Sequence, residues 1–232
     1  MRIAAVIALS ALVAACSQSV GGEAQPPLTS PPAGPPSTTS AVQSPSPSPP
    51  NTSDVPGPGA AIDEVIGWIE AGVPVDPAGF HVAFRDGVTT RLGDDIAFTA
   101  ASGAPHSSTQ CMTDAASDGE LTCLLELAAP PPRPAQAEGM WKPGWVDFSG
   151  TELSVGSLRG DPGPFATGAG AELAAGQSLM FGDNRCRSDM AGLFCVNYAH
   201  RSAVRLAAEG VVAFGCLAEV PAPPQSAVSY RC

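Results

Sequence analysis

The chain has 232 residues, including 25 Gly, 25 Pro and 7 Cys, and its formal net charge is −11. Binding to nucleic acid phosphates requires clustered Lys and Arg, so this acidic composition excludes nucleic acid as a partner. Anionic lipid surfaces would repel the same charge, so any attachment to a membrane must have another cause. The length fits one domain of ordinary size or two small ones.

Residues 1–15 have the pattern of a secretory signal peptide. Arg2 precedes an apolar run that is shorter than the roughly 20 residues of a transmembrane helix. The small residues before Cys16 resemble the bacterial lipobox, in which the Cys receives a diacylglyceryl group and becomes the first residue of the mature chain. The alternative is an ordinary cleaved signal in which Cys16 is incidental. The lipobox predicts anchoring at the extracytoplasmic face of the cell membrane, because acyl chains such as palmitate contribute about 0.8 kcal/mol per buried CH₂.

Residues 16–59 predict a lipidated Cys followed by a disordered tether. From residue 17 onward this segment contains 12 Pro, 9 Ser and 4 Thr and no aromatic residue. Such a composition buries too little apolar surface to offset the entropy of ordering, and its Pro density favours extended polyproline stretches. We expect a spacer between the membrane and the rest of the chain.

Residues 60–232 predict one globular domain, and most of the negative charge belongs to it. Only Arg2, Glu23 and Asp54 among the charged residues precede residue 60. A short helix is expected over residues 61–71, because Ile62, Val65, Ile66 and Ile69 would form one apolar stripe. Acidic residues in its first turn and a following Gly and Pro support these bounds.

The remainder of the domain is typical of β structure. Two runs, residues 80–85 and 88–92, flank Asp86-Gly87, and this pair strongly favours a two-residue hairpin turn. A helical turn is expected at residues 171–176. Many short strands separated by Gly and Pro predict a mostly β fold, a small antiparallel sandwich or barrel with one short N-terminal helix. The further strands are expected at residues 95–100, 111–113, 121–127, 144–148, 153–155, 178–181, 192–197, 203–206 and 211–214.

Six cysteines remain after Cys16, and behind a secretory signal they predict disulfide bonds. The segments around Cys111–Cys123 and Cys186–Cys195 are similar: each places a Cys before Thr or Ser and Asp, then a Gly-containing turn and a second Cys in an apolar strand. We expect each pair to join its own hairpin, which leaves Cys216–Cys232 to fasten the C-terminus. The strongest competing pairing joins Cys195 to Cys216. The spacings match neither a structural zinc site nor a redox Cys-x-x-Cys motif, so we expect no metal and no thiol chemistry.

Motifs for catalysis and cofactor binding are not found. The three His residues form no metal-binding motif, and neither a Gly-x-Ser-x-Gly elbow nor a phosphate-binding Gly-rich loop is present. We therefore predict no catalytic residue and no cofactor. His200 is the best single candidate for a catalytic residue, since it follows a strand with a predicted disulfide and has polar neighbours in the sequence. The alternative is a structural or surface His.

Two Trp residues, Trp141 and Trp145, flank a predicted Lys-Pro-Gly turn at residues 142–144. Exposed Trp faces bind sugar rings or acyl chains, which makes both rings candidate ligand contacts. The alternative is that they cover a small core, as large aromatic side chains usually do.

Four segments of the chain form a distinctive set: residues 68–72, 141–148, 181–186 and 191–200. Together they resemble the LppI-like family of mycobacterial lipoproteins. The resemblance covers the signal and most of residues 60–232, and it implies a location in the mycobacterial cell envelope without implying an activity. Phe98, Ser102, Gly103, Cys111 and Cys123 also resemble a wider set of actinobacterial secreted proteins.

These features favour a lipid-anchored envelope protein with a non-catalytic domain that binds an envelope glycan, a lipid or a protein partner. A carrier of apolar lipid in a β interior is one form of this hypothesis, and it predicts a large apolar cavity. The alternative is an extracytoplasmic hydrolase that uses His200 and a nearby acidic residue.

Overall fold

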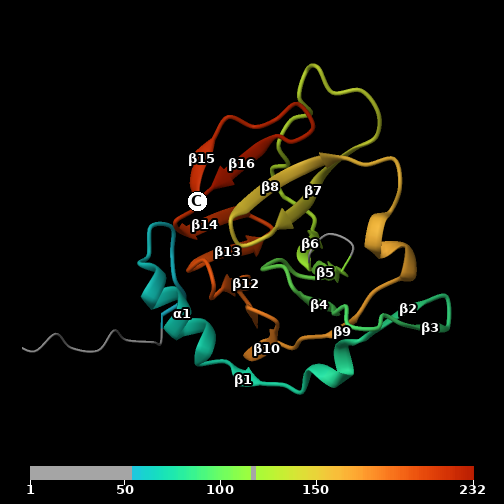
Figure 1. The fold of residues 1–232 in the computed structure, drawn as a ribbon, viewed down its shortest axis with the longest axis vertical. Helices are drawn as coiled ribbons and strands as arrows, with labels where there is room; N and C mark the ends of the chain where they lie inside the picture. Colours follow the sequence, from blue (N-terminus) through green and yellow to red (C-terminus); the bar gives the residue numbers. More distant parts are fainter. Residues whose placement is uncertain (1–53, 116–118) are drawn as a thin grey trace, which may run out of the picture. The chain divides into compact units, whose positions relative to one another are not determined.

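A computed structural model describes residues 54–115 and 119–232 (Figure 1). Within these residues the chain is mostly β, as predicted, with one α-helix near its N-terminal end. The strands form two large sheets and a separate two-stranded hairpin. Neither large sheet closes on itself, so the fold is sandwich-like and not a barrel.

The first large sheet has six strands. All neighbours are antiparallel except the short β1, which pairs parallel with β10. Every residue of β12 is buried, because both faces of this sheet are covered. The strands, in spatial order, are β1 (Val73–Pro74), β10 (Gln177–Phe181), β11 (Asn184–Asp189), β12 (Gly192–Asn197), β13 (Ser202–Ala207) and β14 (Gly210–Gly215).

Helix α1 (Ile62–Glu70) covers one face of the six-stranded sheet, within the bounds predicted for it. Its side chains Val65, Trp68 and Ile69 are buried against apolar residues of β12, β13 and β14. The ring of Trp68 lies 4.5 Å from that of Phe194, between centroids, and the Arg187 guanidinium lies 3.7 Å from the Trp68 centroid. The apolar stripe read from the sequence is thus the face that docks the helix.

The second large sheet has eight strands. It is antiparallel except where β9 pairs parallel with β4. Its spatial order is β15 (Ala218–Val220), β16 (Val228–Arg231), β8 (Glu152–Leu158), β7 (Trp141–Phe148), β6 (Glu120–Leu124), β5 (Ser108–Asp114), β4 (Ala97–Ala101) and β9 (Ala171–Glu172).

The main core lies between the two large sheets, and two disulfides are part of it. Inward side chains of both sheets form one cluster that includes Phe98, Phe148, Leu179 and Leu193. Cys111–Cys123 joins β5 to β6 and Cys186–Cys195 joins β11 to β12, each between directly opposed residues. All four of these cysteines are fully buried. The third disulfide, Cys216–Cys232, fastens the C-terminus, so all three predicted pairings are confirmed and Cys195–Cys216 is excluded.

The outer face of the eight-stranded sheet is partly covered by two further segments. The hairpin of β2 (Val82–Arg85) and β3 (Val88–Arg91) forms as predicted, with positive φ at both Asp86 and Gly87. The 3₁₀ turn η3 (Gly163–Thr167) places Phe165 on this face. A second 3₁₀ turn, η1 (Pro77–Phe80), precedes the hairpin and contributes Phe80 to the main core.

Two local predictions were wrong. The helical turn expected at residues 171–176 begins instead as β9, because Ala171 pairs with Phe98 and the Leu173 N–H donates to the Thr99 carbonyl. The turn expected at residues 142–144 lies inside β7, where a register shift between Lys142 and Val146 interrupts the ladder with β8. Such an irregularity accommodates a Pro in a strand, since Pro has no N–H to donate. The short strands β1, β15 and β16 were not predicted.

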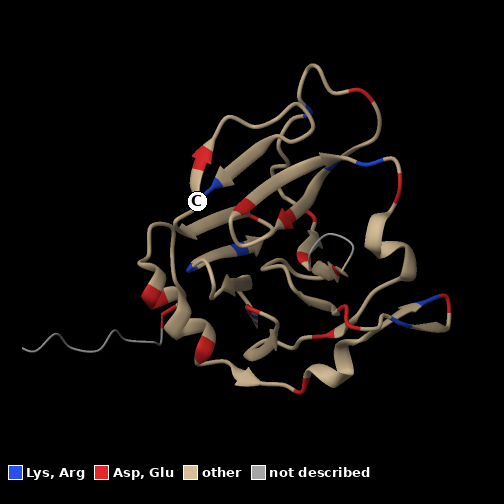
Figure 2. Ribbon diagram, in the orientation of Figure 1, with Lys and Arg blue, Asp and Glu red and all other residues tan. Residues whose placement is uncertain are grey.

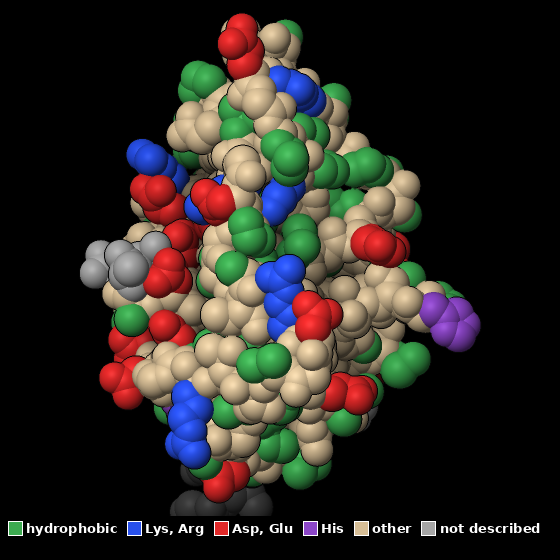
Figure 3. All heavy atoms as spheres, turned by 90° about the vertical axis from the view of Figure 1, so that its right-hand side faces the viewer, with side chains coloured by type: hydrophobic (Ala, Val, Ile, Leu, Met, Phe, Trp, Pro, Cys, Tyr) green, Lys and Arg blue, Asp and Glu red, His purple; other side chains and the backbone are tan. Residues whose placement is uncertain are grey.

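The acidic residues of the described chain are distributed over α1, several strands and the connecting loops (Figure 2). In the space-filling view, acidic side chains gather along the left side of the face shown (Figure 3). The charge imbalance is therefore a surface property of the folded domain.

Candidate functional site

A cavity of about 610 Å³ opens at one end of the sandwich, where the turns of both large sheets meet. We name it the end cavity. The eight-stranded sheet contributes the approach to β4, residues at the end of β5 and the start of β6, and the β7–β8 turn. The six-stranded sheet contributes the β10–β11 and β12–β13 turns. The lining residues that matter most here are Asp94, Asp95, Glu120, Asp183, Asn197 and His200.

The end cavity is acidic. Four carboxylates line it, and none of its described lining residues is Lys or Arg. Asp95 is held in place because its Oδ1 accepts a hydrogen bond of 3.0 Å from Thr113 Oγ1. The same hydroxyl accepts from the Ile96 N–H at 2.8 Å, which ties the start of β4 to the end of β5. Phe148 and Phe181 add apolar surface to the lining.

The pKa of the Glu120 carboxyl is strongly raised. Burial raises its pKa from 4.5 to about 7, and the neighbouring Asp147 raises the pKa further. The Arg159 guanidinium acts in the opposite direction, while Glu152 and Asp114 add smaller repulsions. Near neutral pH this carboxyl is therefore about half ionised, and a cation beside it would favour the charged form.

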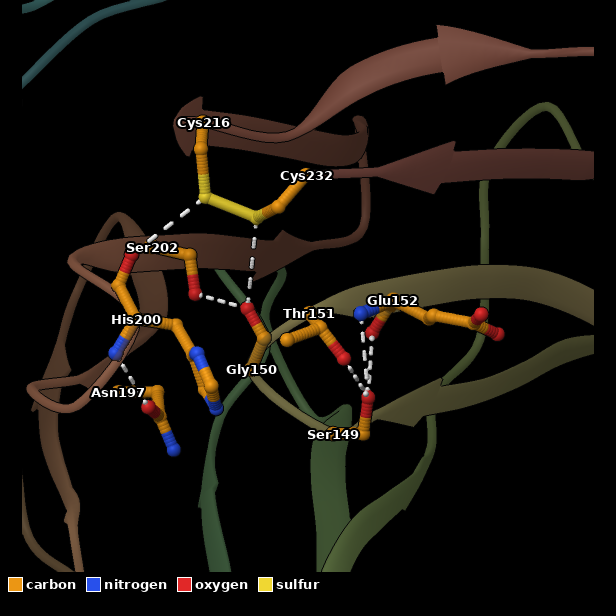
Figure 4. Close-up of a disulfide and its surroundings, with 9 residues drawn as sticks. All are labelled: Ser149, Gly150, Thr151, Glu152, Asn197, His200, Ser202, Cys216 and Cys232. Carbon is orange, nitrogen blue, oxygen red and sulfur yellow. Dashed lines mark hydrogen bonds between the residues drawn. A yellow bond between two sulfur atoms is a disulfide. The ribbon is translucent and has the colours of Figure 1, made fainter.

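Asn197 organises the β12–β13 turn beside the cavity. Its side chain is buried, its Nδ2 donates to Asn184 Oδ1 at 3.0 Å, and its Oδ1 accepts from the His200 N–H at 3.1 Å. A side chain at Gly150 would collide with this amide, since an added Cβ there would lie 2.6 Å from the Asn197 Cγ. The packing between Gly150 and Asn197 thus fixes where the His200 backbone lies (Figure 4).

His200 is exposed and lines the end cavity, so the structure places it near the acidic side chains. Its ring forms no ion pair or hydrogen bond with the residues that the structure describes. A hydrolase of the kind considered above requires a His oriented by a carboxylate within hydrogen-bond reach. The observed arrangement does not preform that pair.

The two predicted Trp contacts lie away from the end cavity, on β7. Trp145 is 1% exposed, its ring meets that of Phe165 at a centroid distance of 5.2 Å, and its Nε1 donates to Asp147 Oδ1 at 2.8 Å. Trp141 is half-buried, and its ring lies where a side chain at Gly156 would be. The Trp145 ring therefore packs in the interior of the outer layer, as the core alternative expects.

The Cys216–Cys232 disulfide lies close to the turns that border the end cavity. Figure 4 shows it above Gly150 and next to the His200 backbone. Both of its cysteines are exposed, unlike those of the two core disulfides. Cys16, the predicted lipidation site, lies outside the described residues.

The carboxylates of the end cavity were not singled out from the sequence. Asp94, Asp95, Glu120 and Asp183 are far apart in the chain, and each lies at a strand end or in a turn, where acidic residues are common. Their convergence depends on which turns of the two sheets share one end of the sandwich. The one local signal in the sequence was the Asp94-Asp95 pair, which spans the start of the strand expected at residues 95–100.

Comparisons with known proteins give no match to a family model, to a curated protein or to a solved structure. Among the described helices none has the length and hydropathy to cross a membrane. In the same part of the chain, no three His, Cys, Asp or Glu side chains are grouped as metal ligands would be.

Proposed function

We propose that this chain is a lipid-anchored extracytoplasmic protein whose β domain binds a small organic cation in the end cavity without catalysing a reaction. The observation that carries the binding proposal is that four acidic residues line a cavity of about 610 Å³ whose described lining contains no Lys or Arg. Cavities of this volume are in the range of small-molecule sites. The anchor rests on the signal peptide pattern and on Cys16.

The composition of the lining favours an amine that also carries an apolar part. The carboxylates attract and hydrogen-bond an ammonium group, and these charge-assisted bonds are stronger than neutral ones. Phe181, which is half-buried, offers apolar contact beside them, whereas Phe148 lines the cavity from the core and is 2% exposed. A fully hydrated inorganic cation would use the charge alone, so an amphipathic amine fits the whole cavity better.

Binding is favoured over the hydrolase alternative because of His200. Its ring lines the cavity but has no carboxylate partner among the described residues. An activated nucleophile would need both a base and a group that orients the base. The cavity offers charge and apolar surface for a ligand, which are the requirements of binding.

The test is calorimetric titration of the full-length chain, in nonionic detergent, with spermidine and phenethylamine as probes. We expect saturable binding at pH 8 that weakens as salt is added, since exposed charges are screened. The double variant Asp94→Asn/Asp183→Asn should bind at least about tenfold more weakly, because it removes two charge-assisted contacts. Both side chains are exposed, so the fold should survive the change.

The matched control is Asp86→Asn, which removes a carboxylate from the hairpin turn outside the cavity and keeps a residue that tolerates positive φ. This variant should bind like the unaltered chain. The proposal is wrong if neither amine binds saturably. It is also wrong if Asp86→Asn loses as much affinity as the double variant.

A further inference from the structure

A second hollow lies on the outer face of the eight-stranded sheet, beside the region covered by η3. We name it the outer-face groove. Its volume is about 870 Å³, and it is lined by residues of β7, β8 and β16 and of the loops that follow β8 and β15. Asp147, Ser154 and Ser229 form one cross-strand row along it, since Ser154 pairs with both of the others.

Serine hydroxyls are the first feature that points to a ligand. Ser157, Ser226 and Ser229 line the groove and are at most 9% exposed. None of their side chains forms a hydrogen bond with another residue in the described part of the chain. Solvent still reaches these three oxygens, since none of them is a buried polar atom without a partner. Each can therefore bond to a water or to a ligand in the groove.

A fixed carboxylate is the second feature. Asp147 Oδ1 accepts from Thr122 Oγ1 and from Trp145 Nε1, both at 2.8 Å. Arg159 lies 3.6 Å from Asp147 Oδ2 and 4.7 Å from the centroid of the Trp145 ring. The carboxylate and the guanidinium are therefore held before any ligand arrives, which lowers the entropy lost on binding. The buried Trp145 has this supporting role.

The charges of the groove are paired within it. Arg159 faces Asp147, and Arg231 forms an ion pair with Glu152 at 3.1 Å. Asp161 is the remaining charged lining residue. Such a groove offers many donors and acceptors but little net charge, so it suits a neutral ligand with many hydroxyl groups.

The backbone N–H and C=O groups at the floor of the groove already form hydrogen bonds between strands of the sheet. Strands β7, β8 and β16 each have a neighbouring strand on both sides. An extended peptide that binds by strand addition needs a free strand edge, and the floor does not provide one. Recognition must therefore come from side chains, which again favours a polyhydroxylated ligand over a peptide backbone.

We infer that the outer-face groove binds a neutral oligosaccharide. Its hydroxyls would bond to Ser226, Ser229 and the fixed Asp147–Arg159 pair. Sugar rings would lie along the row of serines without stacking on Trp145, whose ring is 1% exposed. The groove and the end cavity share no lining residue, although Glu120 of the cavity interacts electrostatically with Asp147 of the groove. The two tests change different residues, so each proposal can fail without the other.

The test uses the full-length chain in nonionic detergent and a panel of neutral gluco-, manno- and galacto-oligosaccharides. A heparin fragment and a neutral Gly/Ser peptide serve as comparators, and binding is followed by saturation-transfer NMR and then by calorimetry. We expect a neutral oligosaccharide to bind with an affinity that changes less than about twofold over a tenfold range of salt, because the groove charges are paired.

The variant Ser226→Ala/Ser229→Ala should weaken this binding by about tenfold or more, because it removes two hydroxyl partners. Thermal unfolding of the variant should match that of the unaltered chain, since neither hydroxyl bonds to another described residue. Ser108→Ala, at an exposed position outside the groove, is the control and should bind normally. No binding by any neutral sugar, preference for heparin or the peptide, or unchanged affinity in the double variant would overturn the inference.

Discussion

Burial raises the pKa of Glu120 to about 7, and Asp147 adds a repulsion that acts in the same direction. Because the folded-state pKa lies above the unfolded-state value of 4.5, the folded protein binds more protons between these two values. The stability contributed by this group is fully present below pH 4.5 and is lost as the pH rises through 7. Part of the carboxyl remains accessible to solvent, which screens the effect and keeps it near 1 kcal/mol.

We therefore predict that Glu120→Gln raises the free energy of unfolding by about 1 kcal/mol at pH 8 and leaves it nearly unchanged at pH 4. Urea unfolding at the two pH values measures this difference. Glu126→Gln, at an exposed position in the loop after β6, is the control and should show little change at either pH. Equal effects of Glu120→Gln at pH 4 and pH 8 would contradict the prediction.

At the scale of elements, two buried disulfides join hairpins in opposite sheets and meet the same core. Cys111–Cys123 and Cys186–Cys195 have no exposed surface, whereas both cysteines of Cys216–Cys232 are exposed at the end of β14 and at the C-terminus. Thiol–disulfide exchange needs access of a thiolate to a sulfur atom. In this fold, one disulfide is therefore accessible to an external thiol and the two core disulfides are protected from it.

We predict that dithiothreitol under native conditions reduces Cys216–Cys232 first. Trapping with iodoacetamide and peptide mass spectrometry should find Cys216 and Cys232 alkylated while the other four remain bonded. The other four cysteines should be reduced and alkylated only after urea unfolds the chain, because unfolding exposes both core disulfides to the thiol. Simultaneous loss of all three bonds in the native protein would show that exposure does not control the order.

At the scale of the whole molecule, the proposed anchor accounts for how an acidic domain would be held at a membrane. Its charge of −11 would oppose contact with anionic lipids, so the proposed anchor relies on buried acyl chains and not on charge.

We predict that the N-terminal peptide of the protein isolated from an actinobacterial host begins at Cys16 and carries the mass of acyl chains. Mass spectrometry of that peptide measures both properties. Cys16→Ala should abolish the added mass, while a variant lacking Cys216 and Cys232 should keep it. An N-terminal peptide without added mass would refute the anchor.

Sequence patterns predicted much of this fold because the relevant physics is local. The stripe on residues 61–71 predicted α1, and Asp86-Gly87 predicted the hairpin turn, since both depend on neighbouring residues. The similarity of the two cysteine segments predicted both core disulfides, because each bond closes a single hairpin. The assignment of residues 171–172 failed because a distant strand, β4, pairs with them.

The sequence by itself determined a disulfide-bonded, mostly β domain with an acidic surface, since composition, periodicity and cysteine spacing act over short distances. Only the tertiary structure decided where binding chemistry collects. Asp95, Glu120 and Asp183 line one cavity because the ends of two sheets meet, and Asp147, Ser154 and Ser229 align through strand register. Neither arrangement is encoded in any one segment, because both depend on the order of strands in the sheets.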